Sequence, residues 1–412
     1  MAIPSSLARD ISPPPPLKRR KTAGVSSPSG THTPSEDIGP TLAAIEAGKA
    51  KIDDHLNYFK NHLAKAFRKT PPEGPRLSID DFAALYHNNQ HHDGNHFVIH
   101  QHNHPKAGVH YDLRLQFSES SSMSFAVPKG LPGNPNSRST GRMAIETRVH
   151  NYWNHLIESA SSKTGSLLIW DTGTYEVLPR KKEGTRGRGM PSPQTTDDEE
   201  SESDSDSGMK TPNIGSPSGE EHENEKLITA FQTRYIRLRL HGTRLPRGYT
   251  IIMRLPSNEI IKRPTARRKG RRKRNDKHNR RHSDSDMASD AVDSSPIQDQ
   301  DPDQDLDTNT DEDAQTRVSN AYPGSTNDVG LVHQRHWFLQ LDRHNSGFVL
   351  DRTDGGKGMW VRDEGERGFE PFFVRGRDFE RSVVTGRLAR DVESDEGVEG
   401  FVGRGGWVGI EH

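Results

Sequence analysis

The sequence predicts a mainly β protein, a small antiparallel β-barrel with an N-terminal helical segment and long disordered inserts. Only 29% of the 412 residues are hydrophobic, and the chain contains 37 glycines and 27 prolines. This composition is too polar for one continuous globule of that length. Short runs typical of β-strands lie between residues 95 and 180, and similar runs return at 227–256 and 336–342. Charged stretches without periodicity separate them.

Composition divides the chain into predicted folded and unfolded segments. In chain order these are a disordered tail with a basic cluster at 1–40, a helical segment at 41–90, the first part of the barrel at 91–180, an acidic disordered insert at 181–225, a barrel hairpin at 226–261, a basic and then acidic disordered insert at 262–330, and a final strand with a Gly- and Arg-rich region at 331–412.

Two helices are expected before the strands. Apolar residues between Thr41 and Lys69 recur at spacings of three, four and seven, which predicts one amphipathic helix. A second short helix is expected at Ile79–Tyr86.

The strands follow in order, with period-two or short apolar patterns. A turn-like Asp-Thr-Gly-Thr sequence at 171–174 is expected to end the strand predicted at 166–170. The predicted strands are 97–99, 109–117, 124–127, 143–147, 166–170, 234–241, 249–255 and 336–341.

Two basic clusters predict nuclear localisation and nucleic-acid contact. Leu17–Lys21 follows four prolines, as expected of a nuclear-import signal. Residues 262–281 contain twelve Lys and Arg and are interpreted as a nucleic-acid-binding arm or a second import signal.

The absence of cysteine excludes disulfides, thiolate catalysis and iron–sulfur clusters, so a metal site must use His, Asp or Glu. The first 30 residues lack the apolar core of a signal peptide, and no run of 18 apolar residues occurs. We therefore expect a soluble, intracellular protein with no membrane partner. Its oligomeric state does not follow from these patterns.

Eight of the 21 histidines lie between His87 and His110, and the predicted strand that follows carries the candidate chemistry. Side chains two apart in a strand share a face, so His110, Asp112 and Arg114 point together. An imidazole with a carboxylate suits a borderline divalent metal, and a neighbouring guanidinium suits the phosphate or carboxylate of a substrate.

A third metal ligand is required, and His102, His104 and the more distant His150 are candidates. With no thiolate available, an open octahedral site favours manganese over zinc, and other divalent metals remain open. The structural alternative is a half-exposed strand with an ordinary His–Asp hydrogen bond and a surface arginine.

Four motifs resemble one known family. They occur in the same order and at compatible spacing in the 3′-phosphoesterase domain of bacterial and archaeal DNA ligase D, of which this chain would be a stand-alone, eukaryotic-type relative with disordered inserts. The motifs are Phe97-Val-Ile-His-Gln-His102, His110-Tyr-Asp-Leu-Arg-Leu115, Phe125-Ala-Val-Pro-Lys-Gly130 and Ile169-Trp-Asp-Thr-Gly-Thr-Tyr-Glu176.

The resemblance implies a small β-barrel that uses manganese to trim the 3′ ends of DNA, removing a terminal ribonucleoside and then the 3′ phosphate. It places His102, His110 and Asp112 on the family's metal ligands, and Arg114 and His150 on its phosphate-binding residues. Counting back from His110 would select His104 instead, but we favour His102 because the preceding strand fixes its position. The implied partners are DNA or RNA-terminated DNA 3′ ends, and DNA-repair proteins.

The sequence also departs from the family. Arg148-Val149 stand where the family has acidic residues, and Asn154 stands where it has a tyrosine. Two alternatives to the enzyme therefore stay open. One is a non-catalytic nucleic-acid-binding or scaffold module on the same barrel, and the other is a non-haem Fe(II) oxygenase with His110, Asp112 and His150 as its facial triad.

Overall fold

The computed structural model describes residues 42, 45, 50, 52–69, 74–180, 221–256, 318–352, 358–363, 365, 368–399 and 401–410. The predicted tail with its import signal, the basic arm and most of both inserts lie outside these residues. None of the helices in the described ranges is long and apolar enough to cross a membrane.

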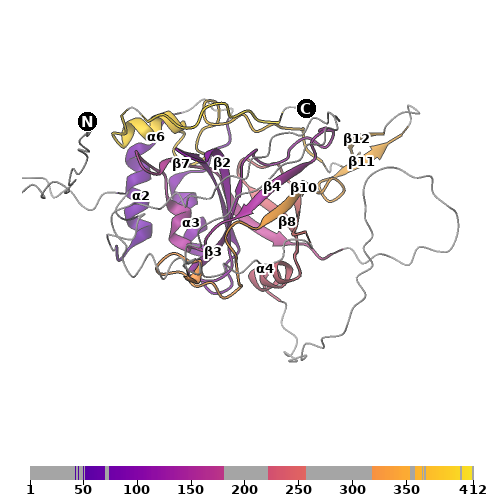
Figure 1. Ribbon diagram of the computed structural model, residues 1–412, viewed down its shortest axis with the longest axis horizontal. Coiled ribbons are helices and arrows are strands. Elements are labelled where there is room, and N and C mark those ends of the chain that lie inside the picture. The colour runs from indigo at the N-terminus through magenta and orange to yellow at the C-terminus, as the bar shows by residue number, and fades with distance from the viewer. Residues whose placement is uncertain are drawn as a thin grey trace, which may run out of the picture. The chain divides into compact units, whose positions relative to one another are not determined.

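Eight antiparallel strands close into a barrel, which confirms the predicted fold class. Their order is β1-β2-β3-β4-β10-β9-β8-β7, and β7 pairs with β1 to complete the circle. The short strands β5 and β6 pair with β3 and β7, and β11 with β12 forms a separate hairpin (Figure 1). The strands are His96–His104 (β1), Gly108–Gln116 (β2), Ser121–Val127 (β3), Gly141–Glu146 (β4), His150–Asn151 (β5), Ser159–Ser161 (β6), Gly165–Val177 (β7), Tyr235–Gly242 (β8), Thr250–Arg254 (β9), His336–Leu341 (β10), Phe348–Asp351 (β11) and Met359–Arg362 (β12).

Apolar and polar side chains alternate along the strands, so the apolar ones point into the core and the candidate site residues point the other way. On β2, Tyr111, Leu113 and Leu115 are fully buried in the main hydrophobic cluster. Aromatic residues from distant segments, such as Phe125 and Trp337 at 5.8 Å between ring centroids, meet in the same cluster. The opposite side chains of β2 therefore face outward from the barrel.

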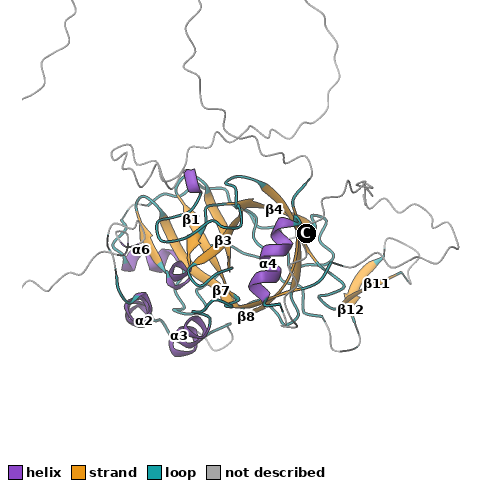
Figure 2. Cartoon of the chain, turned by 90° about the horizontal axis from the view of Figure 1, so that it is seen from below, coloured by secondary structure: helices purple, strands orange, loops and turns teal. Residues whose placement is uncertain are grey.

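Helices α2 (His55–Ala66) and α3 (Ile79–Asn88) belong to a second hydrophobic cluster, outside the main core. This cluster includes Val98 of β1 and Ile169 of β7, so the two helices cover the outer face of those strands (Figure 2). The predicted single helix over 41–69 is wrong, because the Asp54 side chain accepts the backbone N–H of Asn57 and caps a new helix there.

The turn predicted at 171–174 is also wrong, because β7 continues to Val177. Gly173 lies so close to β8 that a Cβ there would sit 1.9 Å from the His241 carbonyl oxygen. The buried Asp171 carboxylate accepts backbone N–H groups of residues 243–245 at 2.8–2.9 Å. Asp171 therefore stabilises the β8–β9 loop and does not form a turn of its own. The β1–β7 pairing also shifts register nearby, between Ile99 and His100.

The sequence did not predict α4 (Glu223–Gln232), which precedes β8. Phe231 of α4 stacks on Trp337 with ring centroids 5.6 Å apart, so α4 packs over the interior of the barrel (Figure 2). Residues 318–330, assigned from sequence to the second insert, are described from Val318 onward, and Ala321 bridges to Val149 beside β5.

Three buried carboxylates fix the C-terminal region, which includes α6 (Ala389–Asp395), to the barrel. Glu380 accepts from the Tyr111 hydroxyl at 2.5 Å, and Glu393 accepts from Asn103 and Ser166. Glu158 pairs with the fully buried Arg387 at 3.0 Å. Buried charges need such partners, so these pairs tie residues 380–393 to β1, β2 and the segment around β6.

Buried histidines should make folding sensitive to acid. Burial lowers the pKa of His96 from 6.5 to about 3, and its Nδ1 lies 2.8 Å from Nδ1 of the buried His155. Between these two pH values the unfolded chain binds a proton that the folded state excludes, so stability falls as the pH drops from 6.5 toward 3. Each such histidine contributes up to about 1.4 kcal/mol per pH unit.

We expect His96→Gln to reduce the pH dependence of the unfolding free energy by about one proton between pH 4 and 6. Chemical denaturation at several pH values measures this slope. His87→Gln, at an exposed position on α3, is the matched control and should reproduce the wild-type slope. Equal slopes for wild type and His96→Gln would contradict a neutral buried His96.

Candidate metal centre

The β1–β2 hairpin brings together three of the sequence-predicted site residues. His102 pairs directly with His110 across the hairpin, and Asp112 follows two residues later on the same face of β2. His102 Nδ1 lies 3.4 Å from one Asp112 carboxylate oxygen, and His110 Nε2 lies 3.4 Å from the other. Antiparallel register alone therefore makes two imidazoles and a carboxylate converge.

Backbone carbonyls orient both imidazoles. His102 Nε2 lies 2.8 Å from the Thr164 carbonyl oxygen, and His110 Nδ1 lies 2.9 Å from that of Gly108. A carbonyl only accepts, so each of these nitrogens carries the proton, and the lone pairs of His102 Nδ1 and His110 Nε2 face Asp112. Acceptors that face one another without a proton between them favour a cation.

This donor set fits a divalent metal ion. One ligand atom from each of the three residues can be chosen so that all lie within 4.8 Å of one another. Among the residues that the structure describes, this is the one such group of His, Asp or Glu. Two imidazole nitrogens and a carboxylate oxygen are ligands that borderline divalent ions accept.

The charges around Asp112 keep it ionised. Burial by itself would raise the pKa of Asp112, but Arg114 and, when they are protonated, His110 and His102 outweigh that effect and hold the pKa well below its usual value of 3.8. A metal ion would take the place of the imidazole protons that face the carboxylate. The Arg114 guanidinium is 3.8 Å from the carboxylate, and its other end donates to the Asn154 carbonyl oxygen at 3.3 Å. Burial also lowers the pKa of His110, which favours the neutral, ligating imidazole.

The fifth predicted residue, His150, lies on β5. Strand β3 pairs with both β2 and β5, and so it connects His150 to the strand that carries Asp112 and Arg114. Arg114 pairs with Ser124 of β3, and His150 pairs with Ser122 of β3. The two serines are two residues apart and share a face, so Arg114 and His150 lie on the same side of the sheet. The His150 Nδ1 donates to the Arg148 carbonyl oxygen at 2.8 Å, which leaves Nε2 as the acceptor nitrogen. Burial, followed by the positive charge of Arg114, lowers the pKa of His150 well below 6.5.

His104 has a different environment from His102. Its Nδ1 accepts the backbone N–H groups of Lys106 and Ala107 at 3.2 and 3.0 Å, so it stabilises the β1–β2 turn. Burial, with the nearby His102 and His110, lowers its pKa to about 4. The geometry thus groups His102, and not His104, with His110 and Asp112.

The sequence interpretation missed several polar groups behind the site. His100 is fully buried opposite Asp112 and lies 3.1 Å from the Ile157 carbonyl oxygen. The short 3-10 helix η1 (Tyr152–Leu156) supplies the Asn154 carbonyl that holds Arg114. His100 could have been found from its two-residue spacing to His102, whereas nothing in the sequence places η1 beside β2.

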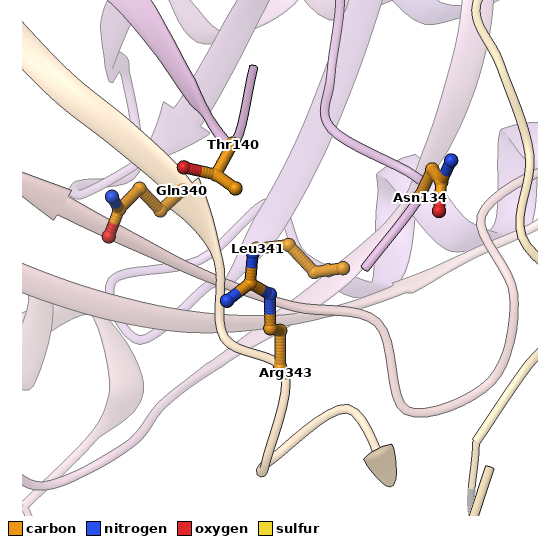
Figure 3. Close-up of a pocket in the computed structure, with 5 residues that line it drawn as sticks. All are labelled: Asn134, Thr140, Gln340, Leu341 and Arg343. Atoms are coloured by element: carbon orange, nitrogen blue, oxygen red, sulfur yellow. The ribbon is translucent and has the colours of Figure 1, made fainter. Parts of the chain in front are cut away.

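A hollow lies away from the candidate metal centre, where β10 meets the loop before β4 (Figure 3). Its ionisable lining residue, Arg343, stacks over Trp360 at 4.9 Å. The lining contains neither a carboxylate nor a histidine, so it offers no comparable metal site. The lining residues are Asn134, Thr140, Gln340, Leu341 and Arg343.

Comparison with known proteins confirms the family resemblance. Residues 100–253 match the family described as the DNA Ligase D 3'-phosphoesterase domain. The multifunctional non-homologous end joining protein LigD of Mycolicibacterium smegmatis is 29% identical over 148 residues, and that of Mycobacterium bovis is 39% identical over 89 residues. The multifunctional non-homologous end joining DNA repair protein LigD of Mycobacterium tuberculosis is likewise 39% identical over 89 residues.

These matches cover part of each protein. The M. smegmatis match spans 34% of this chain and 17% of the relative, and the M. bovis and M. tuberculosis matches span 21% of this chain and 11% of each relative. The similarity therefore concerns one domain of multifunctional proteins. The C-terminal region after residue 253, including β10 and α6, lies outside the matched family range.

Removing the carboxylate should remove the metal affinity. We expect Asp112→Asn, which keeps the side-chain shape but loses the charge, to weaken manganese binding by at least about 100-fold, since even residues behind metal ligands contribute 10- to 100-fold. Isothermal titration calorimetry measures the affinity, and circular dichroism checks folding.

The histidine pair supplies the control for this prediction. His102→Ala should weaken manganese binding to a similar extent, and His104→Ala should retain most of it. Unchanged affinity in Asp112→Asn, or the reverse order of the two histidine variants, would contradict the arrangement.

Proposed function

We propose that this chain is a metal-dependent 3′-phosphoesterase that trims the 3′ ends of DNA, including ends terminated by a ribonucleotide, in DNA repair. The convergence of His102, His110 and Asp112, with Arg114 beside them, is the observation that carries the proposal. The match of residues 100–253 to the ligase D phosphoesterase domain supports it.

His102, His110 and Asp112 would hold the metal ion, and we propose manganese. An ion in this position supplies Lewis-acid polarisation of a phosphate oxygen. Manganese accepts mixed nitrogen and oxygen ligands and leaves positions for substrate and water. The ionised Asp112 and the two carbonyl-oriented imidazoles provide the charge and lone pairs that such binding requires.

Arg114 and His150 would position the scissile phosphate. The guanidinium is 5% exposed and held between Asp112 and Asn154, so its orientation is fixed before substrate arrives. Its planar fork can bind two phosphate oxygens at once. His150 can bind a proton at Nε2, because its Nδ1–H is already donated to a carbonyl.

Removal of a 3′ phosphate would form a bond from water oxygen to phosphorus and break the bond from phosphorus to the 3′ oxygen, which then takes a proton. Removal of a terminal ribonucleoside would instead break the bond from phosphorus to the 5′ oxygen of that nucleoside, which takes the proton and leaves a 3′ phosphate on the strand. Where the neighbouring sugar is a ribose, its 2′-hydroxyl is the alternative nucleophile. The products separate the two routes, because attack by the hydroxyl leaves a cyclic phosphate.

A non-catalytic nucleic-acid-binding module is the second candidate, and Arg148 favours it. This arginine stands where the family has an acidic residue, and its guanidinium stacks over Tyr322 at 5.7 Å beside His150. The oxygenase interpretation needed His150 as the third ligand, whereas His102 is the residue that groups with His110 and Asp112. The basic clusters at 17–21 and 262–281 support our proposals of nuclear localisation and added nucleic-acid affinity.

Variants of Arg114 distinguish a catalytic domain from a non-catalytic module with the same fold. We expect Arg114→Ala to lower single-turnover release of a 3′ phosphate or terminal ribonucleoside by about 100-fold or more, as loss of an oxyanion donor does. Arg114→Lys should restore activity in part, because a point charge cannot replace a bidentate fork.

Manganese affinity and the circular dichroism spectrum serve as controls and should change little in either variant. Equal cleavage rates in all three proteins would contradict the role of Arg114. A wild-type protein that binds the DNA end but cleaves nothing with any divalent metal would favour the non-catalytic module.

A further inference from the structure

The C-terminal segment 401–409 lies against the end of the β1–β2 hairpin that carries the candidate metal centre. A Cβ on Gly403 would sit 2.8 Å from the Asn103 side-chain oxygen, and Asn103 lies between His102 and His104. A Cβ on Gly165 would sit 3.1 Å from the Phe401 ring, and Gly165 follows Thr164, whose carbonyl orients His102. Figure 1 shows this region in yellow, running from α6 along the barrel.

Anchors on both sides hold this segment in place. Before it, Glu393 binds Asn103 and Ser166 and is paired with Arg377 at 2.9 Å. At its C-terminal end, the Trp407 indole N–H donates to the Pro128 carbonyl oxygen at 2.7 Å, and Lys129 donates to the Val408 carbonyl oxygen at 3.2 Å. The residues in between therefore have a defined position beside the hairpin.

Arg404 lies between these anchors and is exposed. Its methylene carbons come within 3.4–3.8 Å of where a Cβ on Gly108 would be, so the side chain crosses the β1–β2 turn. The carbonyl of Gly108 orients His110. Lys106 is exposed in the same turn, and glycines at 403, 405 and 406 leave the Arg404 guanidinium uncovered.

We propose that Arg404 and Lys106 form a basic rim that binds the phosphate backbone of the nucleic-acid strand whose 3′ end enters the candidate metal centre. This inference rests on the proposed function and, through Arg404, adds a contact outside residues 100–253, the range that matches the phosphoesterase family. The β1–β2 turn lies at the end of the hairpin that carries the candidate site, so a strand with its last phosphate at His110 and Arg114 would pass Arg404 and Lys106 if it leaves across this turn. Backbone phosphates are the anions that such a strand presents to exposed cations there.

The rim is a positioning and affinity element that does not take part in the chemistry. Contacts to backbone phosphates fix the register of a strand without reading its sequence. Arg404 should therefore affect substrate binding and KM more than the single-turnover rate at saturation.

The test measures coupling between Arg404 and individual phosphates. The full chain, with manganese, is titrated into a labelled DNA strand that ends in a 3′-methylenephosphonate, whose P–C bond cannot be hydrolysed. In a series of strands, one of the last few linkages is neutralised at a time as a methylphosphonate. Fluorescence anisotropy gives the Kd of wild type, Arg404→Ala, Lys106→Ala and Arg254→Ala.

In wild type we expect neutralisation of one linkage to weaken binding by about threefold to fivefold, the size of an exposed ion pair. In Arg404→Ala that same neutralisation should have no effect, and the salt slope should fall by about one. Arg254→Ala is the matched control, because Arg254 is exposed on β9, four strands from β2 in the barrel, and it should keep the wild-type pattern.

An additive result, in which every linkage has the same effect in wild type and Arg404→Ala, would overturn the rim. Coupling of a linkage to Arg254 but not to Arg404 would overturn it as well. The two proposals fail separately. If Arg404 is coupled to a linkage but the wild-type protein does not hydrolyse a 3′ phosphate, the proposed enzymatic activity is wrong and the rim stands. If the protein hydrolyses the phosphate but no linkage is coupled to Arg404, the rim is wrong and the activity stands.

Discussion

The antiparallel register of β1 and β2 is the constraint on which the candidate site depends. It sets His102 opposite His110 and His100 opposite Asp112, so that one face of two adjacent strands carries four polar side chains. A shift of β2 by one residue would turn His110 and Asp112 into the barrel interior, away from the histidines of β1. The fully buried Tyr111, Leu113 and Leu115 on the other face prevent that shift, because it would expose them.

Burying charge on this face has an energetic cost that neighbouring elements offset. Asp112 and Arg114 are only 6% and 5% exposed, and removing one partner of such a pair typically destabilises a protein by about 3–5 kcal/mol. The Asn154 carbonyl, the Thr164 carbonyl and the Gly108 carbonyl satisfy donors of Arg114, His102 and His110. These carbonyls come from η1, the β6–β7 turn and the start of β2, so elements far apart in the sequence keep the site polar and oriented.

The sequence predicted the eight strands of the barrel from local periodicity, and it missed the short strands β5, β6, β11 and β12. Spacing of two residues was enough to put His110, Asp112 and Arg114 on one face. It could not decide between His102 and His104, because that choice depends on the turn, where His104 accepts the Lys106 and Ala107 N–H groups. It also missed the continuation of β7 through Gly173, which depends on close contact with β8, a strand some 60 residues later.

The C-terminal region was harder to interpret for the same physical reason. Its attachment comes from buried carboxylates whose partners are distant in sequence, such as Glu393 with Asn103 and Glu380 with Tyr111. Nothing in the local pattern of residues 374–409 indicates these pairs. They nevertheless bring Arg404 to the hairpin, so a region beyond the matched family range borders the candidate site.

In the proposed site, the lone pairs of His102, His110 and Asp112 meet at one metal ion beside a phosphate. Pulsed electron paramagnetic resonance of the manganese-loaded protein with inorganic phosphate tests it most directly. We expect coupling of the manganese to two histidine nitrogens and, once phosphate is added, to phosphorus. A spectrum without nitrogen coupling, or one that phosphate leaves unchanged, would contradict it.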